Sequence, residues 1–354
     1  MEPAPALTIR GADGAYPVVI RPGALTDALP AFVQERRFSR IAVISNTTVG
    51  PLYGEALTAR LPDAFLVTVP DGEAHKTLDT AAALYGALLD GGCDRSALVI
   101  ALGGGVIGDL AGFVAATLMR GMALIQAPTS LLAMVDASLG GKVGVDLPQG
   151  KNLVGAFKDP LAVFADTATL RTLPPVEVRC GLAETLKAGL IADPPLVDHL
   201  LAHGPEPVEE IVESAVRVKK LIVEQDRLEH GARAHLNLGH TFAHALEGVS
   251  GYAWKHGEAV ALGLVAAARL SVRRGLAAPD LAATVERAVV ALGLPTRYAG
   301  LDPAALWDAM RHDKKFRGGS ARFVLLRGVG APCMADDVPR DEVIAVLESL
   351  REGA

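Results

Sequence analysis

Histidine is concentrated in one part of the sequence. The chain of 354 residues has nine histidines, and four of them, His235, His240, His244 and His256, fall in HLNLGHTFAHALEG and the nearby YAWKHGEAVALG. His240 and His244 are four residues apart, so in a helix they share one face. Two histidines and one glutamate are typical of an open zinc site with three protein ligands and a free position. The alternative is a set of satisfied core or surface histidines.

Glu184 is the candidate for the acidic ligand. It lies with Lys187 in GLAETLKAGL, Gly181–Leu190, an otherwise apolar segment with helical periodicity. The i, i+3 spacing places the carboxylate and the ammonium on one helix face. An ion pair within the helix is the alternative interpretation, and spacing alone leaves both open.

A run of glycines, Gly103 to Gly105, follows an apolar segment. Leu98–Leu102 is typical of a buried parallel strand, and a helical pattern resumes at Val106. Glycines let the backbone approach a phosphate, and a helix N-terminus supplies free N–H groups and a partial positive charge. This segment therefore indicates a phosphate-binding turn, with an ordinary tight turn against a sheet as the alternative.

The spacing of these glycines also fits a dinucleotide fingerprint, Gly103-x-Gly105-x-x-Gly108. The match is partial, because the next strand carries Gln126 where the fingerprint has an acid, and Asp109 is the nearest acidic candidate. A membrane span is disfavoured, since lipid would leave the opened backbone of the glycines and the Asp109 side chain unpartnered.

Lysine and asparagine are scarce in this chain. Only 10 of the 34 basic residues are lysines, and there are three asparagines. Lys142, Lys151 and Asn152 all lie in the glycine-rich segment Asp136–Phe157. We expect a loop there, with lysines and flexible backbone suited to phosphate or carboxylate capture. An ordinary solvated loop is the alternative, and the basic segment Arg311–Gly319 by itself is typical of a solvated run of charge.

Hydrophobic patterning predicts the elements that position these residues. In the first half, helical segments alternate with five strand-like ones: Tyr16–Ile20, Ile41–Ser45, Phe65–Val69, Leu98–Leu102 and Ala123–Ala127. This alternation predicts a parallel sheet covered by helices, a Rossmann-like α/β domain. Ligands of such sheets bind beyond the carboxyl ends of the strands. Asn46, Asp71–Lys76, the glycine run, and Thr129 with Ser130 fall at those ends.

The second half is predicted to be helical. Helical periodicity runs through Val176–Ile191, Pro207–Asp226, His235–Val249, Gly257–Leu276, Asp280–Leu292 and Pro303–Asp313. A β-like interruption, Ala321–Gly330, predicts a small hairpin, and a last helix follows from Asp341. We expect an α/β domain over residues 1–173 and a helical domain carrying the hairpin over residues 174–354.

Composition limits the class of protein. With 50% hydrophobic residues and a net charge of −6, we expect a soluble globular chain rather than a general nucleic-acid binder. The N-terminus shows no export signal. Cys93, Cys180 and Cys333 are odd in number and far apart, which favours reduced thiols and a cytoplasmic location.

In their order along the chain, these motifs resemble those of the 3-dehydroquinate synthases, a family of sugar phosphate cyclases. The resemblance runs from about Asp71 to Leu326, through DGEAHK, ALGGGVIGDLAGFVAAT, PTSLLAMVDASLGGKVGV, GKNLVGAF, TLPP, GLAETLKAGLI, LNLGHTFAHALE, HGEAVALG and DKK. It implies an NAD-binding α/β domain, a helical metal- and substrate-binding domain, a zinc or cobalt ion, and a homodimer. Asp146 departs from the family pattern, in which Asn is common at that position, as do Ala137 and Leu139.

The resemblance also assigns roles to residues. The implied metal ligands are Glu184, His240 and His256. The implied cofactor-binding residues, with Asn46 at its strand end, are Asp71, Gly72, Glu73, Ala74, His75, Lys76, Gly105, Val106, Ile107, Gly108, Asp109, Thr129, Ser130, Lys142, Lys151, Thr169, Leu170, Arg171 and Thr172. The implied substrate-binding residues are Arg120, Lys142, Lys151, Asn152, Lys187, Lys219, Arg233, Asn237, His244, Lys314 and Lys315, and the implied catalytic residues are Asp136, Lys142, Lys187, Asn237 and His244.

The implied reaction converts 3-deoxy-D-arabino-heptulosonate 7-phosphate to 3-dehydroquinate and phosphate in the shikimate pathway. A secondary alcohol is oxidised by NAD, phosphate leaves by β-elimination, the ketone is reduced again, and an intramolecular aldol step closes the ring. A substrate with a phosphate and a carboxylate accounts for many cations in an acidic chain. Lys219 and Arg233 favour this carboxylated substrate.

Three other functions remain open at this point. Another sugar phosphate cyclase, making a valiolone or an inosose, would use the same steps. A metal-dependent NAD polyol dehydrogenase would form NADH in proportion to substrate and release no phosphate. A nucleotide-binding protein without catalytic activity would need neither the metal ligands nor the set of cations.

Overall fold

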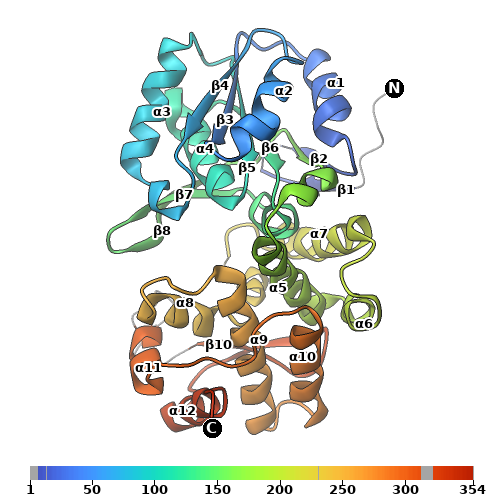
Figure 1. The fold of residues 1–354 in the computed structure, drawn as a ribbon, viewed down its shortest axis with the longest axis vertical. Helices are drawn as coiled ribbons and strands as arrows, with labels where there is room; N and C mark the ends of the chain where they lie inside the picture. The colour runs from blue at the N-terminus through green and yellow to red at the C-terminus, as the bar shows by residue number, and fades with distance from the viewer. Residues whose placement is uncertain (1–6, 13, 230, 312–321, 354) are drawn as a thin grey trace. The chain divides into compact units, whose positions relative to one another are not determined.

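The computed structural model describes residues 7–12, 14–229, 231–311 and 322–353. The chain forms two compact units, Met1–Pro174 and Pro175–Ala354 (Figure 1). Lys314 and Lys315, which the sequence assigns to the substrate, lie outside the described residues.

A seven-stranded sheet in the order β1-β2-β9-β6-β5-β3-β4 organises the first unit. β1 pairs antiparallel with β2, and every other pairing is parallel. All five predicted strands are confirmed, whereas β1 and β9 were not predicted. The strands of this unit, including a separate hairpin, are β1 (Leu7–Arg10), β2 (Ala15–Ile20), β3 (Ile41–Asn46), β4 (Ala64–Val69), β5 (Leu98–Gly103), β6 (Ala123–Pro128), β7 (Lys142–Leu147), β8 (Gly150–Phe157) and β9 (Ala162–Ala165).

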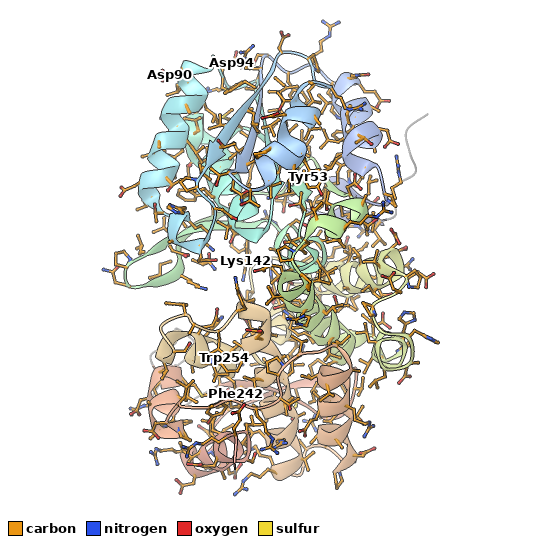
Figure 2. All side chains as sticks on the ribbon, in the orientation of Figure 1. Tyr53, Asp90, Asp94, Lys142, Phe242 and Trp254 are labelled. Atoms are coloured by element: carbon orange, nitrogen blue, oxygen red, sulfur yellow. The ribbon has the colours of Figure 1, made fainter. Side chains whose placement is uncertain are left out.

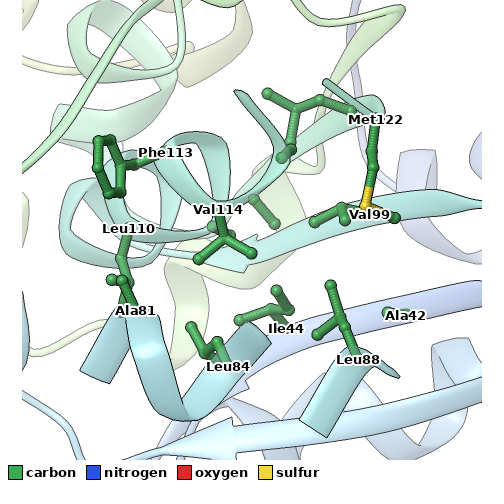
Figure 3. Close-up of a cluster of buried hydrophobic side chains, with 14 of the residues drawn as sticks. Ala42, Ile44, Ala81, Leu84, Leu88, Val99, Leu110, Phe113, Val114 and Met122 are labelled. Carbon is green, nitrogen blue, oxygen red and sulfur yellow. The ribbon is translucent and has the colours of Figure 1, made fainter. Parts of the chain in front are cut away.

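Helices cover both faces of the sheet. They are α1 (Leu29–Gln34), α2 (Glu55–Thr58), α3 (Leu78–Asp90) and α4 (Gly105–Thr117). Alternate residues of β3 point to opposite faces: Ala42 and Ile44 join the core beneath α3 and α4 (Figure 3), and Ile41 and Val43 join the core beneath α1 and α2. Strands buried on both faces need apolar residues, which is why Ile41–Ile44 of β3 and Leu98–Leu102 of β5 are continuous hydrophobic runs.

The glycine-rich segment Asp136–Phe157 is largely an antiparallel hairpin, β7 and β8, so the predicted loop was wrong. Gly144 pairs with Gly155, and a Cβ on Gly155 would lie 2.5 Å from the Val143 carbonyl oxygen. Val143 and Val145 are buried beneath α4. The glycines therefore allow close strand pairing, and they do not make this segment a flexible loop.

The second unit is built from helices with one small hairpin, as predicted, although the second strand of the hairpin begins after the predicted segment, at Pro332. The helices are α5 (Pro175–Ala192), α6 (Pro194–His203), α7 (Val208–Gln225), α8 (His240–Val249), α9 (His256–Arg273), α10 (Asp280–Ala291), α11 (Pro303–Arg311) and α12 (Arg340–Ser349), and the hairpin pairs β10 (Phe323–Leu326) with β11 (Pro332–Ala335). Helix α6 was not predicted. None of the described helices combines the length and apolar character needed to cross a membrane.

One helix begins later than its periodicity predicts. The predicted helix His235–Val249 starts only at His240, after a 3₁₀ turn, Ala232–Asn237. Gly239 has φ 78°, a left-handed conformation that glycine adopts readily. This break makes His240 the first residue of α8.

Candidate functional site

Glu184, His240 and His256 converge in the second unit. The Glu184 Oε1 atom lies 3.5 Å from His240 Nε2 and 3.3 Å from His256 Nε2. One ligand atom from each residue falls within 4.8 Å of the other two. This is the largest set of metal-ligating atoms brought together among the described residues.

Close contacts at glycines bring these three helices together. A Cβ on Gly257, the residue after His256, would lie 2.2 Å from the Cys180 Cα of α5, one helical turn before Glu184. A Cβ on Gly263 of α9 would lie 2.1 Å from the Gly239 carbonyl oxygen, immediately before His240. Only glycine allows backbones to approach this closely. The start of α9 and the start of α8 therefore both reach the glutamate.

The Glu184 carboxylate suits a bound cation. It is 2% exposed, and neither oxygen has a hydrogen-bond partner, although Lys187 forms an ion pair with it. Burial alone would raise the pKa of Glu184, but the charges of Lys187, His240 and His256 hold it well below its usual range. A buried carboxylate without hydrogen bonds, faced by two imidazole nitrogens, fits a divalent metal such as zinc.

The pKa values of His240 and His256 are shifted in opposite directions. Burial lowers the pKa of His240 well below its usual value. Burial would also lower the pKa of His256, but the carboxylates of Glu184 and Glu247 on either side of its ring raise it to about 9. The neutral ring of His240 is already in the protonation state that a metal ligand needs, and His256 must lose a proton to reach that state.

His244 is not part of this cluster. Its ring meets the His240 ring edge to face, with 5.5 Å between centroids, and the residue is exposed. Helical spacing alone favours the pair His240 and His244, but the structure groups His240 with His256 and Glu184.

Several residues assigned to the substrate lie on or after α7. Lys219 and Arg233 are both buried. The Arg233 backbone N–H donates to Asp226 Oδ2 at 3.0 Å, and its guanidinium donates to the Arg227 carbonyl oxygen. The Asn237 side-chain amide donates to Glu229 Oε1 at 2.9 Å. Sequence reasoning did not identify Glu229 or Asp226, because isolated acids in a polar loop carry no periodic signal.

At the carboxyl edge of the sheet, Asp71 is fixed by two side chains. Asn46 Nδ2 donates to Asp71 Oδ1 at 2.6 Å, and the Thr48 hydroxyl donates to Asp71 Oδ2 at 2.8 Å. Asn46 in turn accepts from the backbone N–H groups of Thr48 and Val49. The end of β3 and the segment after β4 are thereby joined.

Lys76 is the centre of a second polar cluster. Its buried Nζ lies 2.8 Å from Glu73 Oε1, 3.3 Å from Asp109 Oδ2 and 3.6 Å from Asp146 Oδ1. It also donates to Asn152 Oδ1 at 2.9 Å. Although burial opposes it, the nearby carboxylates raise the pKa of Lys76, so the ammonium stays charged.

The carboxyl groups of this cluster differ in their pKa values. Burial raises the pKa of Asp109 to about 6, despite the attraction of Lys76. Burial also raises the pKa of Asp146. Burial opposes ionisation of Glu73 as well, but the charge of Lys76 outweighs it and lowers the pKa of Glu73. Three acids share one lysine, so the cluster favours retention of a proton.

The glycine run joins the end of β5 to the start of α4, as predicted. Gly104 caps α4, which begins at Gly105 and includes Val106, Ile107, Gly108 and Asp109. A Cβ on Gly103 would lie 2.8 Å from the Ile107 side chain, so a larger residue there would displace Ile107. The first turn of α4 therefore offers backbone N–H groups at the edge of the sheet.

Other cofactor candidates lie near this edge. The Thr129 backbone N–H donates to the Gly103 carbonyl oxygen at 2.9 Å, and Ser130 follows it. Thr169, Leu170, Arg171 and Thr172 lie in the 3₁₀ turn Thr167–Thr172. The Thr172 hydroxyl is hydrogen-bonded to the Tyr53 hydroxyl at 2.5 Å (Tyr53 is labelled in Figure 2).

The remaining candidates of the first unit differ in exposure. Lys142 is exposed at the first position of β7 (Figure 2), and Lys151 is half-buried near the start of β8. Arg120 is exposed and has φ 70°. Asp136 is half-buried in the helical turn Ala133–Ala137.

The solved structures with a similar fold include sugar phosphate cyclases that contain NAD⁺ and a divalent metal ion. A 2-epi-5-epi-valiolone synthase from Streptomyces hygroscopicus subsp. jinggangensis 5008, solved with NAD⁺ and Zn²⁺, is 30% identical, with a TM-score of 0.87 over 95% of this chain and 96% of that one. A 2-deoxy-scyllo-inosose synthase, in complex with carbaglucose-6-phosphate, NAD⁺ and Co²⁺, is 27% identical, with a TM-score of 0.86 over 97% and 99%.

Comparison of the sequence identifies the family. The family model for the 3-dehydroquinate synthase N-terminal region matches residues 66–180, and the model for the C-terminal region matches residues 181–316. A 3-dehydroquinate synthase from Halorhodospira halophila is 49% identical over 324 residues, which cover 89% of this chain and 91% of that relative. This chain therefore belongs to the 3-dehydroquinate synthase family.

Proposed function

We propose that this protein is a 3-dehydroquinate synthase that converts 3-deoxy-D-arabino-heptulosonate 7-phosphate to 3-dehydroquinate and phosphate. The observation that supports this most directly is the convergence of Glu184, His240 and His256 in a member of this family. Two buried cations, Lys219 and Arg233, favour a substrate with a carboxylate.

The proposed metal is zinc or cobalt, held by Glu184, His240 and His256. When bound, it supplies Lewis acidity to substrate hydroxyls. The ammonium of Lys187, which is buried and paired with Glu184, would stabilise a negatively charged oxygen of the substrate. His244, exposed beside His240, is proposed to exchange protons with the substrate.

The proposed cofactor is NAD, bound at the carboxyl edge of the first unit's sheet. At the start of α4, Gly105 to Asp109, the N–H groups of Gly105, Val106 and Ile107 would donate to the pyrophosphate, since the Gly108 N–H donates to the Gly104 carbonyl oxygen. The segment Asp71–Lys76 would hold the cofactor, since hydrogen bonds from Asn46 and Thr48 orient Asp71. Residues 1–173 would thus bind NAD, and residues 174–354 the metal and most of the substrate.

Different cations are proposed to bind the two acidic groups of the substrate. Lys142, Lys151, Arg120 and one lysine of the pair Lys314 and Lys315 would bind the phosphate, and Lys219 with Arg233 would bind the carboxylate. Asp136, Asn152 and Asn237 would hydrogen-bond the hydroxyls.

We also propose a cytoplasmic homodimer. All three cysteines are free, and Cys93 and Cys180 are buried, which fits a reducing compartment. Sedimentation equilibrium would measure the oligomeric state.

A comparison of substrates tests the proposed function. The purified protein is given zinc or cobalt, NAD⁺, and one of three substrates: the heptulosonate 7-phosphate, a heptulose 7-phosphate without the carboxylate, or a hexose 6-phosphate. The carbocyclic product is then identified by NMR. Turnover of the carboxylated substrate alone supports the proposal. Preferential turnover of either of the other two would assign a valiolone- or inosose-type activity instead.

A further inference from the structure

Glu247 lies on the far side of His256 from Glu184. It belongs to α8, seven residues after His240, and is 3% exposed. Its Oε2 atom lies 3.5 Å from His256 Nδ1, and the Nε2 atom of the same ring lies 3.3 Å from Glu184 Oε1. The imidazole is therefore held between two buried carboxylates.

We infer that Glu247 is a positioning residue that fixes the ring and tautomer of His256 for metal binding. A neutral imidazole carries its proton on one nitrogen and offers the lone pair of the other. If Nδ1–H donates to Glu247, the lone pair is on Nε2, which faces Glu184 and His240. A carboxylate in this position also increases the basicity of the ligand nitrogen.

His240 has the same arrangement with a different acceptor. Its Nδ1 lies 3.1 Å from the Leu238 carbonyl oxygen, which can only accept, so this nitrogen must be the donor. The lone pair of His240 is then on Nε2, which also faces Glu184. In both histidines, Nδ1 thus faces a hydrogen-bond acceptor, and Nε2 faces the Glu184 carboxylate.

The burial of Glu247 indicates that its carboxylate interacts with a compensating group. A carboxylate taken out of water is costly unless a hydrogen bond or charge compensates it, and Glu247 is among the most deeply buried acids. Its charge also complements a divalent cation, since Glu184 alone offsets only half of the cation's charge. Glu247 was not identified from the sequence.

This inference rests on the proposed metal centre, and metal affinity tests both separately. The metal-free protein is titrated with Zn²⁺ against a chromophoric chelator, and with Co²⁺ while the visible d–d spectrum is recorded. The variants are Glu247→Ala and Glu247→Gln. The control is Glu286→Gln, which removes the charge of an acid paired with Arg269 at 2.8 Å in the same unit. Circular dichroism of each metal-free variant confirms folding.

Glu247→Ala is expected to weaken metal binding about 10–100-fold, the usual effect of losing such a partner, and to shift the Co²⁺ spectrum. Glu247→Gln keeps an acceptor without the charge, so its metal affinity should lie between those of the wild type and Glu247→Ala. The metal affinity of Glu286→Gln should equal that of the wild type. Wild-type affinity in folded Glu247→Ala overturns the inference. If the Glu247→Ala variant does not fold, the Glu247→Gln variant decides. Metal affinity weakened by more than about threefold in Glu247→Gln supports the inference, and unchanged affinity overturns it. A wild-type protein that binds neither metal overturns the proposed metal centre instead.

Discussion

The ammonium Nζ of Lys76 donates to the Asn152 side-chain oxygen at 2.9 Å, which ties the segment after β4 to the β7–β8 hairpin. Asn152 has φ 54°, a conformation uncommon for residues other than glycine, and its backbone N–H donates to Asp146 Oδ1 at 2.7 Å. The Asp146 backbone N–H in turn donates to the Lys76 carbonyl oxygen. Asp146 therefore holds Asn152 in the conformation that reaches Lys76.

Removing the Asp146 side chain should loosen this hairpin. Asp146→Ala leaves the Asn152 N–H without its acceptor, so the free energy of unfolding should fall by about 1–2 kcal/mol, and KM for NAD should rise more than kcat falls. Asp146→Asn retains an acceptor and should restore most of both. Equal effects of Ala and Asn in denaturant unfolding and steady-state kinetics would show that the hydrogen bond is unimportant.

The raised pKa of Asp109 predicts how stability depends on pH. Folded, the carboxyl keeps its proton up to about pH 6, whereas in the unfolded chain it loses it near 3.8. The folded state binds more protons between these values, so the contribution of Asp109 to stability falls as pH rises through this window. Asp109→Asn lacks this titration, and its Tm relative to wild type should rise from pH 4 to about 6 and then level off.

A matched control for this experiment is Asp27→Asn. A hydrogen bond from Arg21 lowers the pKa of Asp27. The contribution of Asp27 to stability therefore increases with pH, opposite to that of Asp109. The Tm of Asp27→Asn relative to wild type should change little or fall as pH rises. A pH-independent difference between Asp109→Asn and wild type would refute the assignment of a raised pKa to Asp109.

Arg233→Lys should weaken the carboxylated substrate. A guanidinium binds a carboxylate through two parallel hydrogen bonds, which a lysine cannot reproduce. The expected loss in kcat/KM corresponds to about 1.5–3 kcal/mol. Arg269→Lys, at an arginine paired with Glu286, is the control and should retain activity. Wild-type kcat/KM in Arg233→Lys would remove this arginine from the substrate site.

Metal content should distinguish the histidines. His256→Ala and Glu184→Gln each remove a group of the converging cluster, so both should lose metal on desalting, as measured by elemental analysis. His244→Ala should keep nearly stoichiometric metal and lose most turnover. A fourth protein ligand would close a tetrahedral site and leave no position for substrate. Metal retained in His256→Ala but lost in His244→Ala would reverse the assignment.

The sequence predicts those parts of the fold that carry a periodic or apolar signal. The parallel strands of the first unit are runs such as Leu98–Leu102, and the long helices of the second unit show helical spacing. β9 was missed because it has only four residues, and α6 was missed although it is as long as α8, since its helical pattern begins with two prolines, Pro194 and Pro195. The β7–β8 hairpin was taken for a loop because its glycines suggested flexibility, although Gly144 and Gly155 are required for close pairing.

The sequence predicts only part of the candidate site. Helical spacing pairs His240 with His244, and nothing local to the sequence shows that His256 comes closer to Glu184. That approach depends on Gly257 packing against Cys180 and Gly263 against Gly239, contacts between segments far apart in the chain. No role for Glu247 or Asp146 was predicted from the sequence for the same reason, since each contacts a residue that is not its neighbour in the chain.

The proposed synthase activity is tested most directly by the ratio of phosphate released to cofactor supplied. The protein, with zinc or cobalt, is given the heptulosonate 7-phosphate and NAD⁺ at a small fraction of the substrate concentration, and phosphate and NADH absorbance are followed together. Because NAD is regenerated in each turnover, phosphate should exceed the cofactor many times over while NADH stays negligible. NADH formed in proportion to substrate consumed, without phosphate release, would identify a dehydrogenase and contradict the proposed function.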